Sequence, residues 1–93
     1  MHITILGKRW NLRFVDGRTL PDALGACEPP DSPRKEIRVR KNLQGKEMLD
    51  TCIHEMLHAA DWTKDEHDWI APVASDIAAA LWKLGYRREQ DAT

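Results

Sequence analysis

The sequence predicts a small α+β domain in which a three-stranded antiparallel sheet packs on an αα-hairpin. Two observations favour this class. Residues 2–6, 9–15 and 36–40 have the composition or alternation of strands, and residues 45–61 and 64–84 repeat apolar side chains at helical spacing. A chain of 93 residues is long enough for one small core, so we expect residues 1–93 to form a single domain.

The predicted sheet begins with a β-hairpin. Residues 2–6 are rich in Ile and Thr, and Trp10, Leu12 and Phe14 alternate with polar neighbours in residues 9–15, which indicates a strand with one buried face. Residues 18–35 are rich in proline and are expected to form an irregular loop. Residues 36–40 alternate between charged and apolar side chains, and their charges favour a third strand at the edge of the sheet.

Two helices are expected to follow the sheet. The first, over 45–61, has an apolar face, and Asp61-Trp62 breaks its pattern. Thr63-Lys64-Asp65-Glu66 has the form of a capping box, which predicts that a second helix starts near residue 64. Because the break is short, we expect the second helix to return alongside the first. The apolar face of the first helix is made by Met48, Leu49, Cys52, Ile53, Met56, Leu57 and Ala60.

Composition excludes several classes of partner. The net charge is −1 and no basic stripe occurs, so we expect neither nucleic acid nor a membrane surface as partner. The basic residues between Arg34 and Lys46 are interpreted as a solvated strand edge. Cys27 and Cys52 are too few for a disulfide framework, and no apolar run is long enough to cross a bilayer. These features predict a cytoplasmic protein.

The segment His54-Glu55-Met56-Leu57-His58 carries the clearest chemistry. Residues four apart on a helix share a face, so both imidazoles can reach one metal ion. Glu55 projects from nearly the same side and can act as the general base that takes a proton from water, as in zinc peptidases. The alternative interpretation is a pair of solvated helix histidines beside a glutamate.

The third protein ligand of such a metal must come from elsewhere in the chain. The metzincin pattern requires a histidine where this chain has Lys64, so that pattern is excluded. In a helical hairpin, Glu66 and His67 return to the level of His58 and compete as third ligand, whereas Asp68 points further round. A second role is open for Glu66, which can instead complete the capping box.

Several further residues are candidates for supporting roles. Asp61 lies on the histidine face and can accept the second ring N–H of His54 or His58, or can be a solvated helix-terminal acid; Asp50 is a weaker candidate for the same job. Cys27 is interpreted as an inert loop thiol, with a place near the metal as the alternative. The donors considered for stabilising an oxyanion are Tyr86, Arg38, Arg40 and Arg87.

Three segments together resemble a known family. The run from Leu49 to Asp61, the following Asp65-Glu66 and the ending Leu81–Tyr86 resemble the minigluzincins, small phage- and bacterial-type zinc metallopeptidases, over roughly residues 36–86. The resemblance implies a minimal zincin-like fold, a zinc ion held by His54, His58 and Glu66, and an edge strand that pairs with an extended substrate. Ile37, Arg38 and Val39 match that strand.

The expected function is therefore a zinc-dependent peptidase whose partner is a peptide or protein substrate, with Zn²⁺ as cofactor and Glu55 as base. The main alternative is a zinc-stabilised binding or regulatory module with little turnover. It is motivated by the small size of the chain, since nothing after the second helix builds a far wall for the cleft unless a homodimer or another partner supplies it. A metal-free structural domain is the third possibility.

Overall fold

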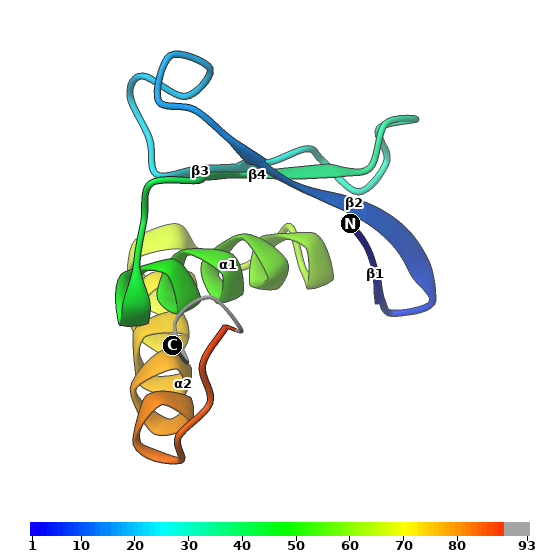
Figure 1. The fold of residues 1–93 in the computed structure, drawn as a ribbon. Coiled ribbons are helices and arrows are strands. Elements are labelled where there is room, and N and C mark those ends of the chain that lie inside the picture. Colours follow the sequence, from blue (N-terminus) through cyan, green and yellow to red (C-terminus); the bar gives the residue numbers. More distant parts are fainter. Residues whose placement is uncertain (89–93) are drawn as a thin grey trace.

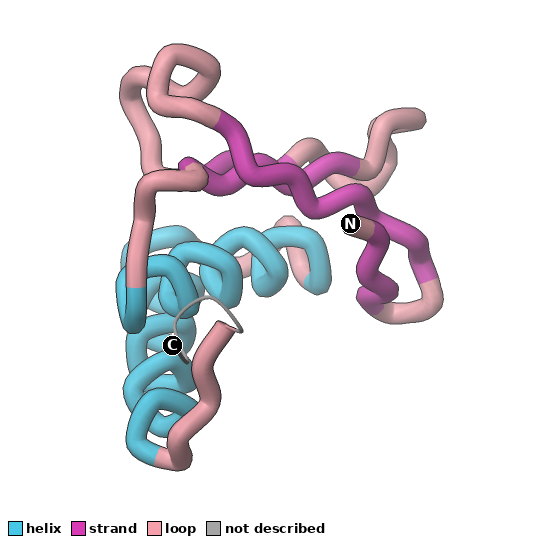
Figure 2. Tube along the Cα trace, in the orientation of Figure 1, coloured by secondary structure: helices cyan, strands magenta, loops and turns pink. Residues whose placement is uncertain are grey.

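Within the described residues, four strands, two α-helices and one π-helical turn form three layers, with α1 packed under the sheet and α2 below α1 (Figures 1 and 2). This computed structural model describes residues 1–88, so the last five residues of the predicted domain lie outside the described part. The α+β class is confirmed. No helix of the described residues is long and apolar enough to cross a membrane. The elements are β1 (His2–Ile5), β2 (Lys8–Val15), β3 (Gly25–Cys27), β4 (Glu36–Arg40), α1 (Gly45–Ala60), the π-helical turn η1 (Glu66–Ile70) and α2 (Ala71–Lys83).

The sheet is mixed, and its strand order is β1-β2-β4-β3. The predicted hairpin is confirmed, because β1 and β2 pair antiparallel around a two-residue turn in which Leu6 (φ 50°) and Gly7 (φ 75°) both have positive φ. The prediction of three antiparallel strands is wrong, because β4 pairs with β2 in parallel and the predicted irregular loop contains a fourth strand, β3. A long connection lets β4 enter in the direction of β2, and part of that connection returns as β3.

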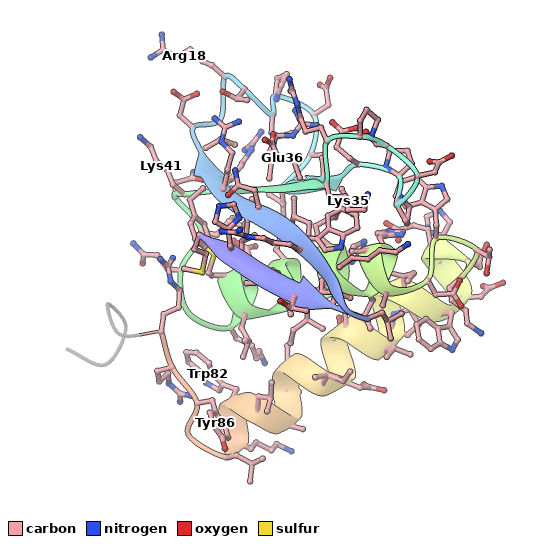
Figure 3. The ribbon with its side chains drawn as sticks, turned by 90° about the vertical axis from the view of Figure 1, so that its right-hand side faces the viewer. Arg18, Lys35, Glu36, Lys41, Trp82 and Tyr86 are labelled. Atoms are coloured by element: carbon pink, nitrogen blue, oxygen red, sulfur yellow. The ribbon has the colours of Figure 1, made fainter. Side chains whose placement is uncertain are left out.

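The predicted edge position of residues 36–40 is also wrong, since β4 lies between β2 and β3. The charged and apolar residues of β4 alternate because one face of the strand packs in the core and the other face forms ion pairs. Ile37 and Val39 are fully buried, whereas Glu36 on the other face contacts Arg13 at 3.2 Å and Arg38 at 3.8 Å. Figure 3 shows Lys35 and Glu36 where β4 begins and Lys41 just after it ends. The strand at the edge of the sheet above α1 is β3.

The core occupies the space between the sheet and α1, and a smaller cluster lies between α1 and α2. Helix α1 can serve both because its apolar residues cover one side of the helix and leave the histidine face free. The first cluster consists of Trp10, Leu12, Ile37, Val39, Leu43, Met48 and Ala59, and the second of Ile53, Ala74 and Ala78.

The second helix begins differently from the prediction. Asp65, not Thr63, is the N-cap: its Oδ2 accepts a hydrogen bond of 2.6 Å from the backbone N–H of Asp68. The first turn is π-helical, with the N–H of Ile70 bonded to the carbonyl of Asp65 at 2.8 Å. Pro72 stands just after this turn, and a wider turn relieves the clash between a proline ring and the preceding carbonyls. The predicted capping box is therefore wrong.

Candidate metal centre

Three side chains converge on the exposed face of α1 near its C-terminal end. The Nε2 atom of His54 lies 2.8 Å from Oε1 of Glu66, and Nε2 of His58 lies 2.9 Å from Oε2 of the same carboxylate. One ligand atom from each residue lies within 4.8 Å of the other two. His54, His58 and Glu66 form a group that could hold a metal ion.

Local structure places each of the three. His54 and His58 are one helical turn apart on α1, so their rings share a face, with centroids 5.2 Å apart. Glu66 is the first residue of η1, immediately after the Asp65 cap, and this brings its carboxylate back over both rings. Because Asp65 caps the helix, the capping role considered for Glu66 is filled by its neighbour.

The other candidate ligands do not join this group. His67 is exposed on η1 and is not among the side chains that converge with His54 and His58 in the described part of the chain. Asp68 uses its backbone N–H to bond the Asp65 cap and is likewise exposed. Of the competing ligands Glu66 and His67, the geometry places Glu66 at the site.

The donor set suits a divalent metal. A carboxylate can only accept a hydrogen bond, so the contacts with Glu66 are hydrogen bonds when Nε2 of each ring carries a proton. In the tautomer protonated at Nδ1, the Nε2 atom of each ring is free to bind a metal. Two imidazole nitrogens with one carboxylate is a set used by catalytic zinc, and it leaves a coordination position open. One ligand atom from each of the three residues lies within 4.8 Å of the others, which is compact enough for the group to share one ion.

Glu55 lies beside this group but is enclosed differently. Its side chain is only 9% exposed, and its Oε1 lies 4.0 Å from Nε2 of His54, so it makes no hydrogen bond in the described part of the chain. Burial raises the pKa of the Glu55 carboxyl, while His54 and His58 lower it and Glu66 raises it further. The result is a carboxylate held near the three ligand atoms and free to exchange a proton.

The strand β3 covers Glu55 from the other side. A Cβ atom built on Gly25 would lie 3.0 Å from Cγ of Glu55 and 3.2 Å from the carbonyl oxygen of Arg38, so only glycine allows this close approach. The N–H of Arg40 bonds the carbonyl of Leu24, and Glu28 bonds Glu36 in the same antiparallel pair. By alternation, the backbone groups of Gly25 and Cys27 point outward from the sheet edge.

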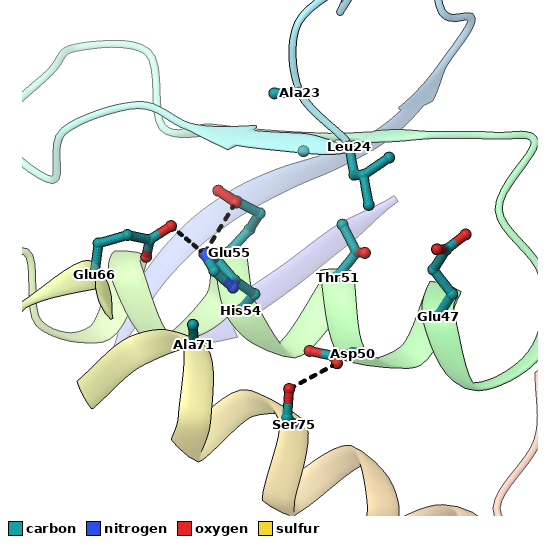
Figure 4. Close-up of a pocket in the computed structure, with 11 residues that line it drawn as sticks. Ala23, Leu24, Glu47, Asp50, Thr51, His54, Glu55, Glu66, Ala71 and Ser75 are labelled. Carbon is teal, nitrogen blue, oxygen red and sulfur yellow. Dashed lines mark hydrogen bonds and ion pairs between the residues drawn. The ribbon is translucent and has the colours of Figure 1, made fainter. Parts of the chain in front are cut away.

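The site opens into a cleft with two arms that meet at Glu55. The larger arm, of about 410 Å³, extends from His54 past Thr51 toward Glu47, with Leu24 above and Ser75 below, as Figure 4 shows. The smaller arm, of about 360 Å³, is lined by Gly25, Cys27, Glu55, His58, Trp62 and Glu66. Sequence reasoning missed β3 and the larger arm, because a Gly-Ala-Cys segment carries no strand periodicity.

The supporting candidates lie elsewhere. Oδ1 of Asp61 accepts bonds from the backbone N–H and the hydroxyl of Thr63, at 3.0 and 2.6 Å, and these bonds lower the pKa of Asp61; neither histidine ring is among its partners in the described chain. Asp50 instead accepts a 3.0 Å bond from the Ser75 hydroxyl. Cys27 lines the smaller arm, and burial, reinforced by Glu55 and Glu28, raises its pKa to about 12.

The four residues considered as oxyanion donors lie outside the cleft, and the three arginines have other partners. Arg40 donates to the carbonyl of Leu20 at 2.6 and 2.9 Å, and Arg38 lies between Glu28 and Glu36. Arg87 stacks on Trp82, and Figure 3 shows Tyr86 at the C-terminal end of α2. Within residues 1–88, none of them lines either arm of the cleft.

Comparison with known proteins adds no further assignment. No family model matches the chain, and neither the curated proteins nor the solved structures give a match. The function is therefore inferred from the geometry of this site and from the sequence motif.

Proposed function

We propose that this chain is a zinc-dependent peptidase of minimal, gluzincin-like type. The observation that carries the proposal is the arrangement around Glu55. A buried carboxylate without a hydrogen bond faces a cleft beside His54, His58 and Glu66, whose ligand atoms lie within 4.8 Å of one another. The Glu55 carboxylate keeps an ion-pair contact of 4.0 Å with His54 and makes no hydrogen bond among the described residues, so it is positioned to act as a general base.

Zinc is the proposed metal because two imidazoles and one carboxylate, with a position left open, are typical of catalytic zinc sites. When bound, the ion would supply a Lewis acid that lowers the pKa of water and polarises a carbonyl oxygen. The resemblance to minigluzincins in the helical motif and in Glu66 agrees with this choice. Two free cysteines agree with a reducing compartment such as the cytoplasm.

The residues of the chain then have separate tasks. Glu55 accepts a proton from the attacking water and returns it to the leaving amine, and it can do both because it has no competing hydrogen bond. The outward backbone groups of Gly25 and Cys27 pair with an extended peptide, which adds a strand to the sheet beside Glu55. The substrate strand is thus β3 rather than the predicted residues 37–39, which are internal.

One observation favours the alternative of a zinc-stabilised binding module. No Arg, Lys or Tyr lines either arm of the cleft within the described residues, so a developing oxyanion finds no second electrophile from these side chains. A binding module needs none. In a peptidase, a partner chain or closure around the substrate has to supply that donor.

The test is peptide cleavage by zinc-loaded wild type and Glu55→Gln. Gln keeps the size of the side chain and removes the base, so we expect turnover to fall by about 10²–10⁴-fold while zinc content is unchanged. His67→Ala, which alters an exposed histidine outside the ligand group, is the control and should cleave normally. Equal cleavage by wild type and the Gln variant, or none by either across a broad peptide library, contradicts the peptidase proposal.

A further inference from the structure

The two arms of the cleft differ in charge, and the larger one is strongly acidic. Its walls include the carboxylates of Glu47, Asp50, Glu55 and Glu66, and no Lys or Arg lines it in the described chain. Figure 4 shows Glu47 and Thr51 following His54 and Glu55 back along α1, with Asp50 turned toward Ser75. The smaller arm instead has the thiol of Cys27 and the ring of Trp62, which is 46% exposed.

The acidic charge of the larger arm exceeds what a metal would balance. The two positive charges of a divalent ion offset Glu55 and Glu66, since both histidines bind as neutral ligands. The carboxylates of Glu47 and Asp50 remain, and neither has a Lys or Arg within ion-pair distance among residues 1–88. Asp50 accepts a hydrogen bond from Ser75, which orients it without neutralising it. The Glu55 side chain is 9% exposed, lies 4.0 Å from His54 and lines both arms, so the acidic arm leads directly to the proposed general base.

The direction of β3 relates each arm to one end of a substrate. Gly25 lies over Thr51 and Glu55, and the larger arm continues past it to Ala23 and Leu24. Cys27, further along β3, lies at the smaller arm beside His58. A peptide that adds antiparallel to β3 therefore runs from the smaller arm to the larger one. Its residues before the cleaved bond lie near Cys27, and its residues after that bond lie near Gly25.

We propose that the larger arm is a specificity subsite for a basic side chain, Lys or Arg, in the first residue after the cleaved bond. Side chains opposite Gly25 point to the same face as a Cβ on Gly25, that is, toward α1 and into the acidic arm. Glu47 and Asp50 attract the cationic end of such a side chain, while Leu24 and Ala71 contact its aliphatic stem. This inference rests on the proposed function, because it assigns the cleft to a peptide.

Zinc-anchored probes test the subsite without requiring turnover. A hydroxamate group followed by Lys-Ala, Met-Ala or Glu-Ala amide binds zinc and extends along the product side of the cleft. Binding is measured by calorimetry on zinc-loaded protein at low salt. We expect the Lys probe to bind about 3–10-fold more tightly than the Met probe, with the Glu probe weakest, and the ratio to shrink in 0.5 M NaCl. Hydroxamates with the variable residue on the opposite side of the zinc-binding group should show no preference for Lys.

Two matched variants distinguish a local effect of the subsite from an effect of the protein's overall negative charge. Asp50→Asn should bring the Lys-to-Met ratio close to one, whereas Asp76→Asn, which removes an exposed acid outside the cleft, should leave it unchanged. Equal binding of Lys and Met probes, a Lys preference only on the opposite side, or no hydroxamate binding to zinc-loaded protein overturns the proposal. A Lys preference without any peptide cleavage would sink the peptidase function and leave the subsite standing.

Discussion

Two cavities flank helix α1, and the residues that line them differ in charge and polarity. The cleft under β3 carries four carboxylates and His54, and Glu55 has no hydrogen bond in the described chain. The cavity on the other side, of about 260 Å³, is apolar, and guanidinium groups cover its aromatic walls, with Arg87 3.3 Å from the Trp82 ring. The apolar side of α1 therefore stabilises the fold. The side with His54 and Glu55 carries polar groups that can bind a metal ion or a ligand. The apolar wall includes Leu12, Phe14, Met48, Leu49, Cys52 and Trp82.

The largest expected effect lies on the apolar side. Met48 is 2% exposed and packs between α1 and the sheet, so Met48→Ala should lower the free energy of unfolding by about 2–5 kcal/mol through lost burial and a cavity. Denaturant unfolding of the apo protein measures this. The folded fraction should still bind one zinc ion per chain. If the folded variant bound less than one zinc ion per chain, the apolar side would also be needed for metal binding, which contradicts the account.

On the polar side, His58→Ala should weaken zinc binding and leave the stability of the apo protein nearly unchanged. We expect the zinc dissociation constant to rise by about 100-fold or more, because even indirect partners of a metal contribute 10–100-fold to affinity. The ring of His58 is partly exposed, so unfolding of the apo protein should change little. His67→Ala is the matched control, and its zinc affinity should equal that of wild type. Calorimetric zinc titration against a competing chelator gives both values.

Gly25 tests the contact between β3 and Glu55. Gly25→Val places a side chain where only 3.0 Å separates Cβ from Glu55, so β3 must shift, and we expect a loss of about 1–3 kcal/mol in stability together with weaker peptide binding. Gly17→Ala, whose nearest neighbour is the flexible Arg40 side chain at 3.7 Å, is the control and should be neutral within about 0.5 kcal/mol. Equal stability of the two variants would show that β3 does not lie this close to the base.

The smallest expected effect concerns the cap that positions Glu66. Asp65→Ala removes the side-chain acceptor of the 2.6 Å bond from Asp68 and should lower stability by about 1 kcal/mol, with a modest loss of zinc affinity as Glu66 becomes less well held. Asp65→Asn can still cap the helix and should retain both. A loss of stability without any change in zinc affinity would separate the cap from the metal site.

Local spacing was enough to predict part of the site. His54, Glu55 and His58 lie on one helix, and their relative positions follow from helical geometry alone. Glu66 was predicted only as one of two ligands, because the choice depends on where the second helix starts. Asp65 and the π-helical turn decide that start, whereas the sequence indicated a capping box with Thr63.

The parts that sequence could not predict depend on contacts between distant segments. The Gly25–Cys27 strand exists because it pairs with β4, and nothing in its own composition indicates a strand. The charges of β4 were interpreted as an exposed edge, but they form ion pairs on the outer face of an internal strand. The acidic arm combines side chains of α1, η1 and α2, so its residues could be grouped only after the helices were placed.

The most direct test of the metal centre is an anomalous difference map at the zinc absorption edge, from crystals of zinc-loaded protein. The account predicts one peak about 2.0–2.2 Å from Nε2 of His54, Nε2 of His58 and a carboxylate oxygen of Glu66, with Glu55 outside the coordination shell. No peak at these residues, or a peak in which His67 replaces Glu66, would contradict it.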